Sequence, residues 1–333
     1  MTNIKHFLIT GGTGSFGKAM VKRLLDHSQQ DTIITVFSRD EDKQEQMRRI
    51  YPDESIHYIV GDIRDYDAIR RAMYGVQYVF HAAALKQVPS CEDNPMEAIS
   101  TNLYGSNNVL KAAGENGIKA IVCLSTDKAC YPINTMGMTK ALMEKLTIDY
   151  AKQSAYHKNS TTKYLLTRYG NVAGSRGSVI PLFIDKIKRG LPLPITDMRM
   201  TRFLMSMDDA LDLVEKAWSS QYTYGGQTYI YKAEATTIET LVLALFELFN
   251  KKVDLEVVGT RPGEKLEETL VGAEEMVRTM DCDKYFVIHP WTVQVKQGKQ
   301  KHPFTSGTTT LLTINQTKEK LLTMDFVREA LDV

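Results

Sequence analysis

Short runs of apolar and β-branched residues alternate with helical patterns over the first half of the chain. The runs expected to be buried strands are residues 6–10, 32–37, 58–60, 78–81, 120–124 and 164–168. Apolar residues at helical spacing fill the intervals, most clearly at residues 18–26, 96–114 and 137–153. Because strands that alternate with helices pair in parallel and are covered on both faces, this pattern predicts an α/β protein with a Rossmann-type doubly wound parallel sheet.

The pattern changes near Gly174, beyond which the predicted elements are shorter and Pro and Gly are more frequent. We therefore expect two lobes. Residues 1–172, joined again by a segment around 205–232, are expected to form the sheet domain, and residues 173–204 and 233–333 a smaller C-terminal substrate-binding lobe. The stretch after Ile288 contains a polar run of Gln and Lys and is expected to be irregular.

The composition narrows the functional class. The chain has 333 residues, 43% of them hydrophobic, which is enough for a large core. Its 41 Lys and Arg nearly balance 40 Asp and Glu, so no overall basic field attracts nucleic acid or anionic lipid. The four cysteines form no CxxC pair, the histidines lack metal-ligand spacing, and no apolar run approaches bilayer length. We expect a cytoplasmic protein without a metal site, a nucleic-acid partner or a membrane segment.

Glycines recur in the turn between the first predicted strand and the first predicted helix. Their spacing is GxxGxxG. Glycine is needed where the backbone turns tightly or approaches a pyrophosphate, and a helix N-terminus offers N–H groups to phosphates. The turn therefore predicts a dinucleotide site rather than a merely tight connection. The residues expected to contact the cofactor here are Gly11, Thr13, Gly14, Ser15, Phe16 and Gly17.

The residues after the second and fourth predicted strands bear on the identity of the cofactor. Ser38, Arg39 and Lys43 stand where NAD-specific proteins usually place a carboxylate, and a hydroxyl with cations suits the 2′-phosphate of NADP. Asp40 and Glu41 also lie within reach of a ribose, but we expect NADP in preference to NAD. Further expected contacts are Asp62 with the adenine edge and Ala82, Ala83 and Ala84 with the nicotinamide ribose.

Candidate catalytic residues follow the fifth predicted strand. Ser125-Thr126-Asp127-Lys128 lies at the carboxyl edge of the sheet, where open α/β folds bind their ligands, and Lys140 stands early in the next predicted helix. An Asp–Lys neighbour pair is often only a surface ion pair. The position directly after a buried strand that faces the cofactor disfavours this interpretation, and Thr126, Asp127 and Lys128 are candidates for proton transfer or hydrogen bonding to a ligand.

Together these segments resemble the extended short-chain dehydrogenase/reductases. More narrowly, the chain resembles the inverting UDP-N-acetylglucosamine 4,6-dehydratases, nearest to the capsule and O-antigen dehydratase/5-epimerase branch, some members of which are labelled UDP-glucose 4-epimerase. The resemblance covers nearly the whole chain and thins after Ile288. The motifs that carry it are SRDEDKQ (38–44), HAAALKQVPSCE (81–92), STDKACYPIN (125–134), RYGNV (168–172), SRGSVIPLF (175–183), MTRF (200–203) and RPGEK (261–265).

One residue departs from the wider family. That family carries Tyr-x-x-x-Lys, with the tyrosine hydroxyl helping to remove a proton, whereas this chain has Met136 at the tyrosine position before Lys140. A thioether cannot transfer a proton. The capsule dehydratase branch is similar in having methionine here, so the substitution favours that branch over a simple 4-epimerase.

The resemblance implies a reaction in which C4 of the sugar is oxidised, water is lost across C5 and C6, and C5 is inverted. Lys128 would remove the C5 proton, with its pKa lowered by Lys140 and the cofactor. Asp127 would protonate the departing C6 hydroxyl, and Thr126 would hydrogen-bond the C4 oxygen. Water, Lys128 or Tyr131 are open alternatives for the base at the C4 hydroxyl. Two other functions stay in consideration: a UDP-sugar 4-epimerase, and an idle NADP-binding protein, which Met136 favours and the intact acid and base oppose.

The same resemblance implies further binding residues, and it makes residues 1–172 an NADP-binding domain and the second lobe a UDP-sugar-binding lobe. Additional cofactor contacts are implied at Ile63, Lys86, Asn102, Lys140, Tyr169 and Asn171. Contacts with the UDP-N-acetylhexosamine substrate are implied at Lys86, Asn171, Ser178, Ile180, Pro181, Phe183, Thr196, Arg202, Arg261 and Glu264, although Phe183 fits core packing equally well. A homo-oligomer is expected, a hexamer by resemblance, because apolar residues of helix 137–153 cannot all face one sheet.

Overall fold

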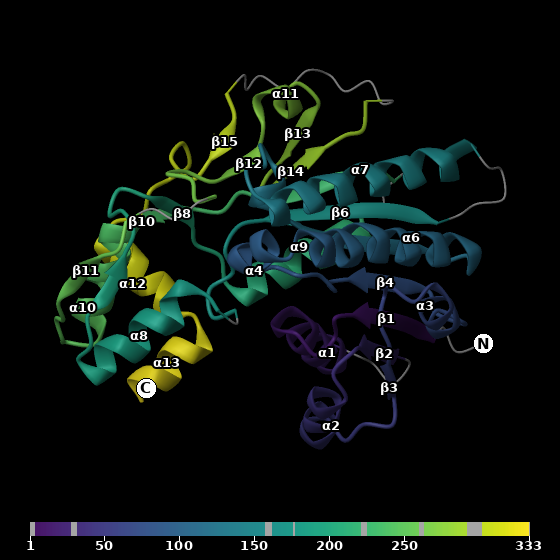
Figure 1. Ribbon diagram of the computed structural model, residues 1–333, viewed down its shortest axis with the longest axis horizontal. Helices are drawn as coiled ribbons and strands as arrows, with labels where there is room; N and C mark the ends of the chain where they lie inside the picture. Colours follow the sequence, from purple (N-terminus) through teal and green to yellow (C-terminus); the bar gives the residue numbers. More distant parts are fainter. Residues whose placement is uncertain are drawn as a thin grey trace.

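The computed structural model describes residues 4–27, 32–156, 162–175, 177–220, 225–259, 263–291 and 302–332. At its centre is a nine-stranded sheet with the order β13-β14-β9-β6-β5-β4-β1-β2-β3 (Figure 1). Its strands are β1 (Lys5–Thr10), β2 (Thr32–Ser38), β3 (Ile56–Val60), β4 (Tyr78–His81), β5 (Ala120–Thr126), β6 (Lys163–Tyr169), β9 (Thr228–Tyr231), β13 (Thr279–Cys282) and β14 (Tyr285–Ile288).

Neighbouring strands from β3 to β9 run parallel, and β14 and β13 add an antiparallel edge. The chain starts in the middle of the sheet at β1, moves outward to β3, and crosses back to β4 on the other side of β1. The connections that leave the carboxyl ends of the neighbouring strands β1 and β4 therefore lead to opposite halves of the sheet, and such a switch point leaves a crevice for a ligand. The predicted doubly wound sheet is confirmed, and each predicted strand overlaps an observed one.

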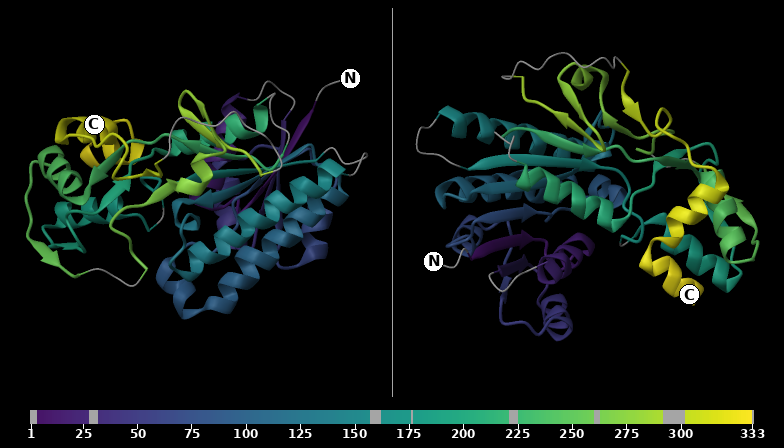
Figure 2. Two further views of the ribbon diagram at one scale, coloured as in Figure 1. Left: turned by 90° about the horizontal axis from the view of Figure 1, so that it is seen from above. Right: turned by 180° about the vertical axis from the view of Figure 1, so that it is seen from behind.

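Helices cover both faces of the sheet, as strands buried on two sides require. Side chains of α1 (Ser15–His27), α2 (Glu41–Ile50) and α9 (Met207–Ser219) join one hydrophobic cluster with the strands. Side chains of α3 (Tyr66–Ala72), α6 (Ser106–Glu115) and α7 (Thr135–Tyr156) join a second cluster on the opposite face. Figure 2 shows α6 and α7 lying side by side along that face.

The helix predicted over residues 96–114 is interrupted. The structure has α5 (Pro95–Ala98), a π-helical turn η1 (Ile99–Gly105) and then α6. The apolar spacing alone does not reveal the wider turn. Its residue Asn102 is fully buried, and its side-chain amide donates to Leu85 O and accepts from Leu85 N, at 2.9 and 2.8 Å. The π turn thus presents a side chain that fixes the loop after β4.

A second group of elements follows residue 172 and has its own hydrophobic cluster. Its helices are α8 (Val179–Arg189), α10 (Ile238–Leu248), α12 (Ile314–Leu322) and α13 (Asp325–Leu331). Short two-stranded sheets complete it, pairing β7 (Leu193–Ile195) with β11 (Leu255–Val257), β8 (Thr201–Phe203) with β10 (Ala235–Thr237), and β12 (Thr269–Val271) with β15 (Phe304–Thr305).

The end of the chain corrects one expectation. Residues 314–331, predicted to be irregular, form α12 and α13, which lie beside α8 and α10 (Figure 1). The side chains of Leu321 and Val327 are fully buried in the hydrophobic cluster that α8, α10, α12 and α13 share, and a reciprocal capping box between Thr313 and Gln316 starts α12. The polar run of Gln and Lys lies largely outside the described residues. Within the described chain, no helix combines the length and the apolar character needed to cross a bilayer.

Candidate active site

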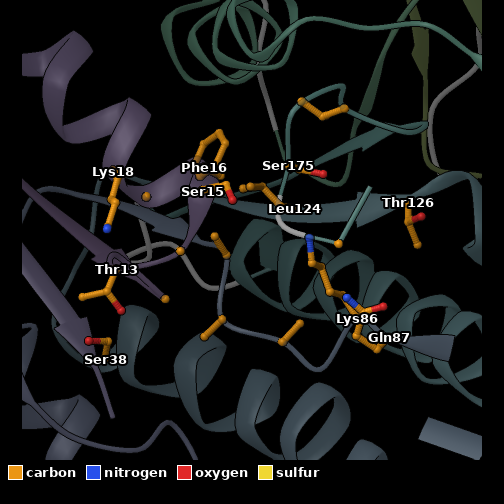
Figure 3. Close-up of a pocket in the computed structure, with 18 of the residues that line it drawn as sticks. Thr13, Ser15, Phe16, Lys18, Ser38, Lys86, Gln87, Leu124, Thr126 and Ser175 are labelled. Atoms are coloured by element: carbon orange, nitrogen blue, oxygen red, sulfur yellow. The ribbon is translucent and has the colours of Figure 1, made fainter. Parts of the chain in front are cut away.

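A cleft of about 1380 Å³ follows the carboxyl ends of the parallel strands. It is lined by the turn after β1, the ends of β2, β4 and β5, and the segment around Asn171 and Ser178. In Figure 3, Thr13 and Ser38 lie at one end of this pocket, whereas Lys86 and Thr126 lie toward the other. The cleft thus connects the predicted cofactor residues with the predicted catalytic ones.

The glycine turn packs too tightly for any other residue at two positions. Gly11 has φ +66°, and an added Cβ would lie 2.9 Å from the backbone of Ala83. A Cβ on Gly17 would lie 2.4 Å from Gly12. The close packing fixes the backbone of this turn where it enters the N-terminus of α1. All the loop residues predicted to contact the cofactor line the cleft. A backbone cradle at a helix N-terminus fits a pyrophosphate.

The end of the cleft near β2 carries charges of both signs. The guanidinium of Arg39 lies 3.7 Å from the Asp62 carboxylate, and the ammonium of Lys43 pairs with the Asp40 carboxylate, which also caps α2. The hydroxyl of Ser38 accepts a hydrogen bond from the Gln44 amide at 3.0 Å. Cations are thus present for a 2′-phosphate, and carboxylates are present for a ribose hydroxyl.

At the other end, β5 leads into the short 3-10 turn η2 (Asp127–Ala129). The hydroxyl of Thr126 donates to Asp127 Oδ1 at 2.8 Å, and the ammonium of Lys128 donates to the same oxygen at 3.0 Å. Thr126 and Lys128 line the cleft, whereas Asp127 is fully buried behind them. Asp127 therefore acts on a ligand only through a small shift or through these two neighbours.

A residue that the sequence did not indicate completes this cluster. Glu268 Oε1 lies 3.6 Å from the Lys128 ammonium and 3.9 Å from Arg202 Nε. Burial lowers the pKa of Lys128, but the negative charges of Asp127 and Glu268 outweigh it and hold that pKa above its ordinary value. The expectation that the pKa of Lys128 is lowered by Lys140 is therefore wrong.

Lys140 shows the lowered pKa instead. Its ammonium is buried in α7 and donates to Leu124 O at 2.8 Å, and burial lowers the pKa to about 8. Met136, one helical turn earlier, is 4% exposed and lines the cleft. A Cβ on Gly137 would lie 2.2 Å from Lys128 O, so the start of α7 packs tightly against the turn η2. The structure thus brings Met136, Lys128 and Lys140 to one place.

Tyr131 points elsewhere. Its hydroxyl donates to Glu274 Oε2 at 2.5 Å and accepts from the backbone N–H of Ala273 at 2.8 Å. The residue has φ +49° and is not among the residues that line the cleft. Of the open alternatives for the base at C4, Tyr131 is the one that this arrangement disfavours.

The predicted binding residues fall into three groups. Those at the cleft include Ile63, Ala82, Ala83, Ala84, Lys86, Tyr169, Asn171 and Ser178. Those away from the cleft lining are Asn102, Ile180, Pro181, Phe183, Thr196, Arg202 and Glu264. Ile180 and Phe183 belong to the buried cluster that α8 shares with α10, α12 and α13, so packing explains them, and the Arg202 guanidinium donates to Thr201 O and Lys265 O. Arg261 lies outside the described residues.

A buried ion network behind the cleft was also not predicted. Arg168 at the end of β6 is paired with Glu144 of α7 and with Glu275 of α11 (Ala273–Met276), at 2.5 and 2.7 Å. Glu144 Oε1 also accepts from the hydroxyl of the cleft residue Ser125 at 2.6 Å. The network ties the end of β5 to a helix and to a distant segment. Arg168 stands within the motif RYGNV, which was the only sequence signal for it.

The doubly wound sheet and this cleft define an extended short-chain dehydrogenase/reductase fold of the nucleotide-sugar epimerase and dehydratase type. The chain belongs to the family described as "Polysaccharide biosynthesis protein", whose model matches residues 7–290. It is 48% identical to a UDP-glucose 4-epimerase of Rickettsia bellii over 98% of each chain.

Solved structures show the same architecture. The X-ray structure of Pen from Bacillus thuringiensis is 34% identical, with a TM-score of 0.87 over 97% of this chain and 98% of that one. The dTDP-glucose 4,6-dehydratase DesIV from Streptomyces venezuelae, solved with NAD and TYD bound, is 22% identical, with a TM-score of 0.67 over 78% and 86% of the two chains. At that identity the likeness concerns the fold alone. The chain is thus an enzyme of the nucleotide-sugar epimerase and dehydratase group.

Proposed function

We propose that this enzyme is an NADP-dependent UDP-N-acetylglucosamine 4,6-dehydratase that inverts C5. The observation that carries the proposal is the ion pair between the buried Asp127 and the cleft residue Lys128, with Met136 in place of a proton-transferring tyrosine. Loss of water across C5 and C6 requires a base for one carbon and an acid for the other. Inversion at C4 alone, the reaction of a 4-epimerase, requires no acid or base at C5 and C6.

The cofactor would be held by the glycine turn, by Ser38 and Arg39 at one end, and by Lys140 at the other. When bound, it would supply the hydride chemistry: a hydride leaves C4, whose hydroxyl proton passes to water or to Lys128, and the hydride returns to C6. Thr126 orients the C4 oxygen through its hydroxyl. The ketone acidifies C5, so the Lys128 amine takes that proton once it has lost its own. Asp127 gives a proton to the departing C6 hydroxyl, either after a small shift of its side chain or through the hydroxyl of Thr126.

The nucleotide end is proposed to lie in the second lobe, formed by residues 173–204 and 233–333. Asn171 and Ser178 stand at the edge of the cleft toward this lobe, and both carry groups that hydrogen-bond phosphate oxygens. We also propose a homo-oligomer, a hexamer by resemblance. Met138 and Leu142 of α7 and Tyr104 of η1 are 49%, 50% and 61% exposed, an apolar surface that a second subunit would bury.

A UDP-sugar 4-epimerase is the second candidate, and the names of relatives that share nearly half of this sequence favour it. One assay separates the two. UDP-N-acetylglucosamine is incubated with the enzyme in deuterated water, and the product is examined by NMR. A 4-keto-6-deoxy sugar labelled at C5 supports the dehydratase. A C4 epimer without C5 label supports the epimerase. If the protein binds the cofactor but forms no product, it is an idle NADP-binding protein.

The cofactor preference is tested at Arg39. We expect Arg39→Ala to weaken NADP binding by about 10–100-fold while leaving NAD binding unchanged, because a charge-assisted pair with the 2′-phosphate is worth about 1.5–3 kcal/mol. Binding titrations with both cofactors measure this. Arg49→Ala, which removes a 76% exposed arginine of the same region, is the matched control. Equal wild-type affinity for the two cofactors contradicts the preference.

The tyrosine position is tested by Met136→Tyr. The side chain of Met136 packs against Cys91 and Ala98 and is almost fully buried, so a larger ring displaces its neighbours or enters the cleft. We expect turnover to be unchanged or lower, since misplacement of the sugar slows the reaction. Met138→Tyr, at an exposed position of the same helix, is the control. A large gain in rate would show that the chain is an impaired member of the tyrosine-containing family.

A further inference from the structure

Two carboxylates from distant segments contact one ammonium. Lys128 Nζ donates to Asp127 Oδ1 at 3.0 Å and lies 3.6 Å from Glu268 Oε1. Asp127 follows β5, whereas Glu268 immediately precedes β12. Both carboxylates are buried, at 0% and 3% exposure, and the backbone of Glu268 is held by two hydrogen bonds with Ser306. Glu268 is thus held beside the proposed base by a segment that is distant in the sequence from Asp127.

The second oxygen of each carboxylate lacks a donor. Within the described chain, Asp127 Oδ2 and Glu268 Oε2 are buried without a hydrogen-bond partner. Two ionised carboxylates with buried oxygens that accept no hydrogen bond raise the free energy of the folded state. A proton shared within the cluster lowers that free energy. The charged groups facing Glu268 are Asp127, Lys128, Arg202 and Lys265. Burial and then repulsion from Asp127 raise the pKa of Glu268, against the lowering effect of the three cations.

We propose that Glu268 is a positioning residue that accepts the proton of Lys128 and so prepares the Lys128 amine to act at C5. The idea rests on the proposed dehydration. At the start Lys128 is an ammonium, Glu268 is ionised, and the proton shared within the cluster is on Asp127. One N–H bond of Lys128 then breaks and an O–H bond forms on Glu268, so this ion pair becomes a neutral amine and a neutral acid. After Asp127 has given its proton to the departing hydroxyl, the proton on Glu268 passes to Asp127, and the cluster regains its starting state.

The contact between Glu268 and Lys128 is tested without turnover. Lys128 is reductively methylated at a series of pH values, and the labelling is measured by peptide mass spectrometry. In the wild-type protein the labelling midpoint should lie above the ordinary lysine value of 10.5. Glu268→Gln should lower that midpoint by about one pH unit, because it removes a negative charge beside the ammonium. Glu267→Gln, at the exposed neighbouring glutamate, should not. A wild-type midpoint at or below 10.5 overturns the proposal even if the variant fails to fold.

The role of Glu268 in the reaction is tested by kinetics with UDP-N-acetylglucosamine as the substrate. Glu268→Gln should lower kcat about tenfold with KM unchanged, and should move the acid side of the pH–rate profile to lower pH. An unchanged profile, or a higher KM with normal kcat, overturns the proposal. If the wild-type enzyme dehydrates no UDP-N-acetylglucosamine but the labelling shift is found, the proposed function fails and the contact between Glu268 and Lys128 stands.

Discussion

Lys128→Ala is expected to lower the conversion of UDP-N-acetylglucosamine by about 10³-fold, because positioned general acids and bases contribute about 10²–10⁴-fold. The loss should fall on kcat and leave nucleotide binding almost intact. Lys128 contacts Asp127 and Glu268 and lies at the end of the cleft away from the Arg39 region. Steady-state kinetics and a UDP titration measure the two effects separately.

Asp127→Asn should produce a similar loss by a different route. The amide keeps the shape of the carboxyl and its contact with Thr126, but it cannot give a proton to a departing hydroxyl. For Lys128→Ala, the matched control is Lys145→Ala, which removes an exposed lysine of α7. If either active-site variant keeps near-normal turnover, the acid and base have been assigned to the wrong residues.

Lys140→Met is expected to abolish activity and yet to stabilise the cofactor-free protein. The ammonium of Lys140 is completely buried, and that burial lowers its pKa from 10.5 to about 8. At 1.36 kcal/mol per pKa unit, keeping the charge in the native state below pH 8 costs on the order of 3 kcal/mol. The lost hydrogen bond to Leu124 O offsets about 1 kcal/mol of this. The unfolding free energy should therefore rise by about 2 kcal/mol at pH 7.

The pH dependence has a definite sign. The unfolded chain holds the Lys140 proton up to about pH 10.5, whereas the native protein releases it near pH 8. Between these values the unfolded state binds more protons, so wild-type stability should rise with pH relative to Lys140→Met. Urea unfolding at pH 7 and pH 10 measures the difference, which should shrink at the higher pH. A variant that is less stable than wild type at pH 7 contradicts the burial argument.

The sequence by itself determined the parts of this protein that depend on local pattern. Runs of β-branched residues and the helical spacing between them sufficed for the strands, and the glycines at 11, 14 and 17 placed the turn after β1. Thr126 and Lys128 could be located at the cleft because the carboxyl ends of parallel strands share one edge of a sheet. Short helices with mixed polarity gave a weaker signal, and for that reason α12 and α13 were missed.

Only the tertiary structure decided the electrostatics of the site. Lys128 and Glu268 are far apart in the chain, as are Arg168 and Glu275, and no periodicity connects such residues. The same holds for the pKa values: Lys140 was expected to lower that of Lys128, but its ammonium turns to Leu124 O while two carboxylates surround Lys128. A pKa depends on burial and on charges within a few ångströms, and folding alone brings those together.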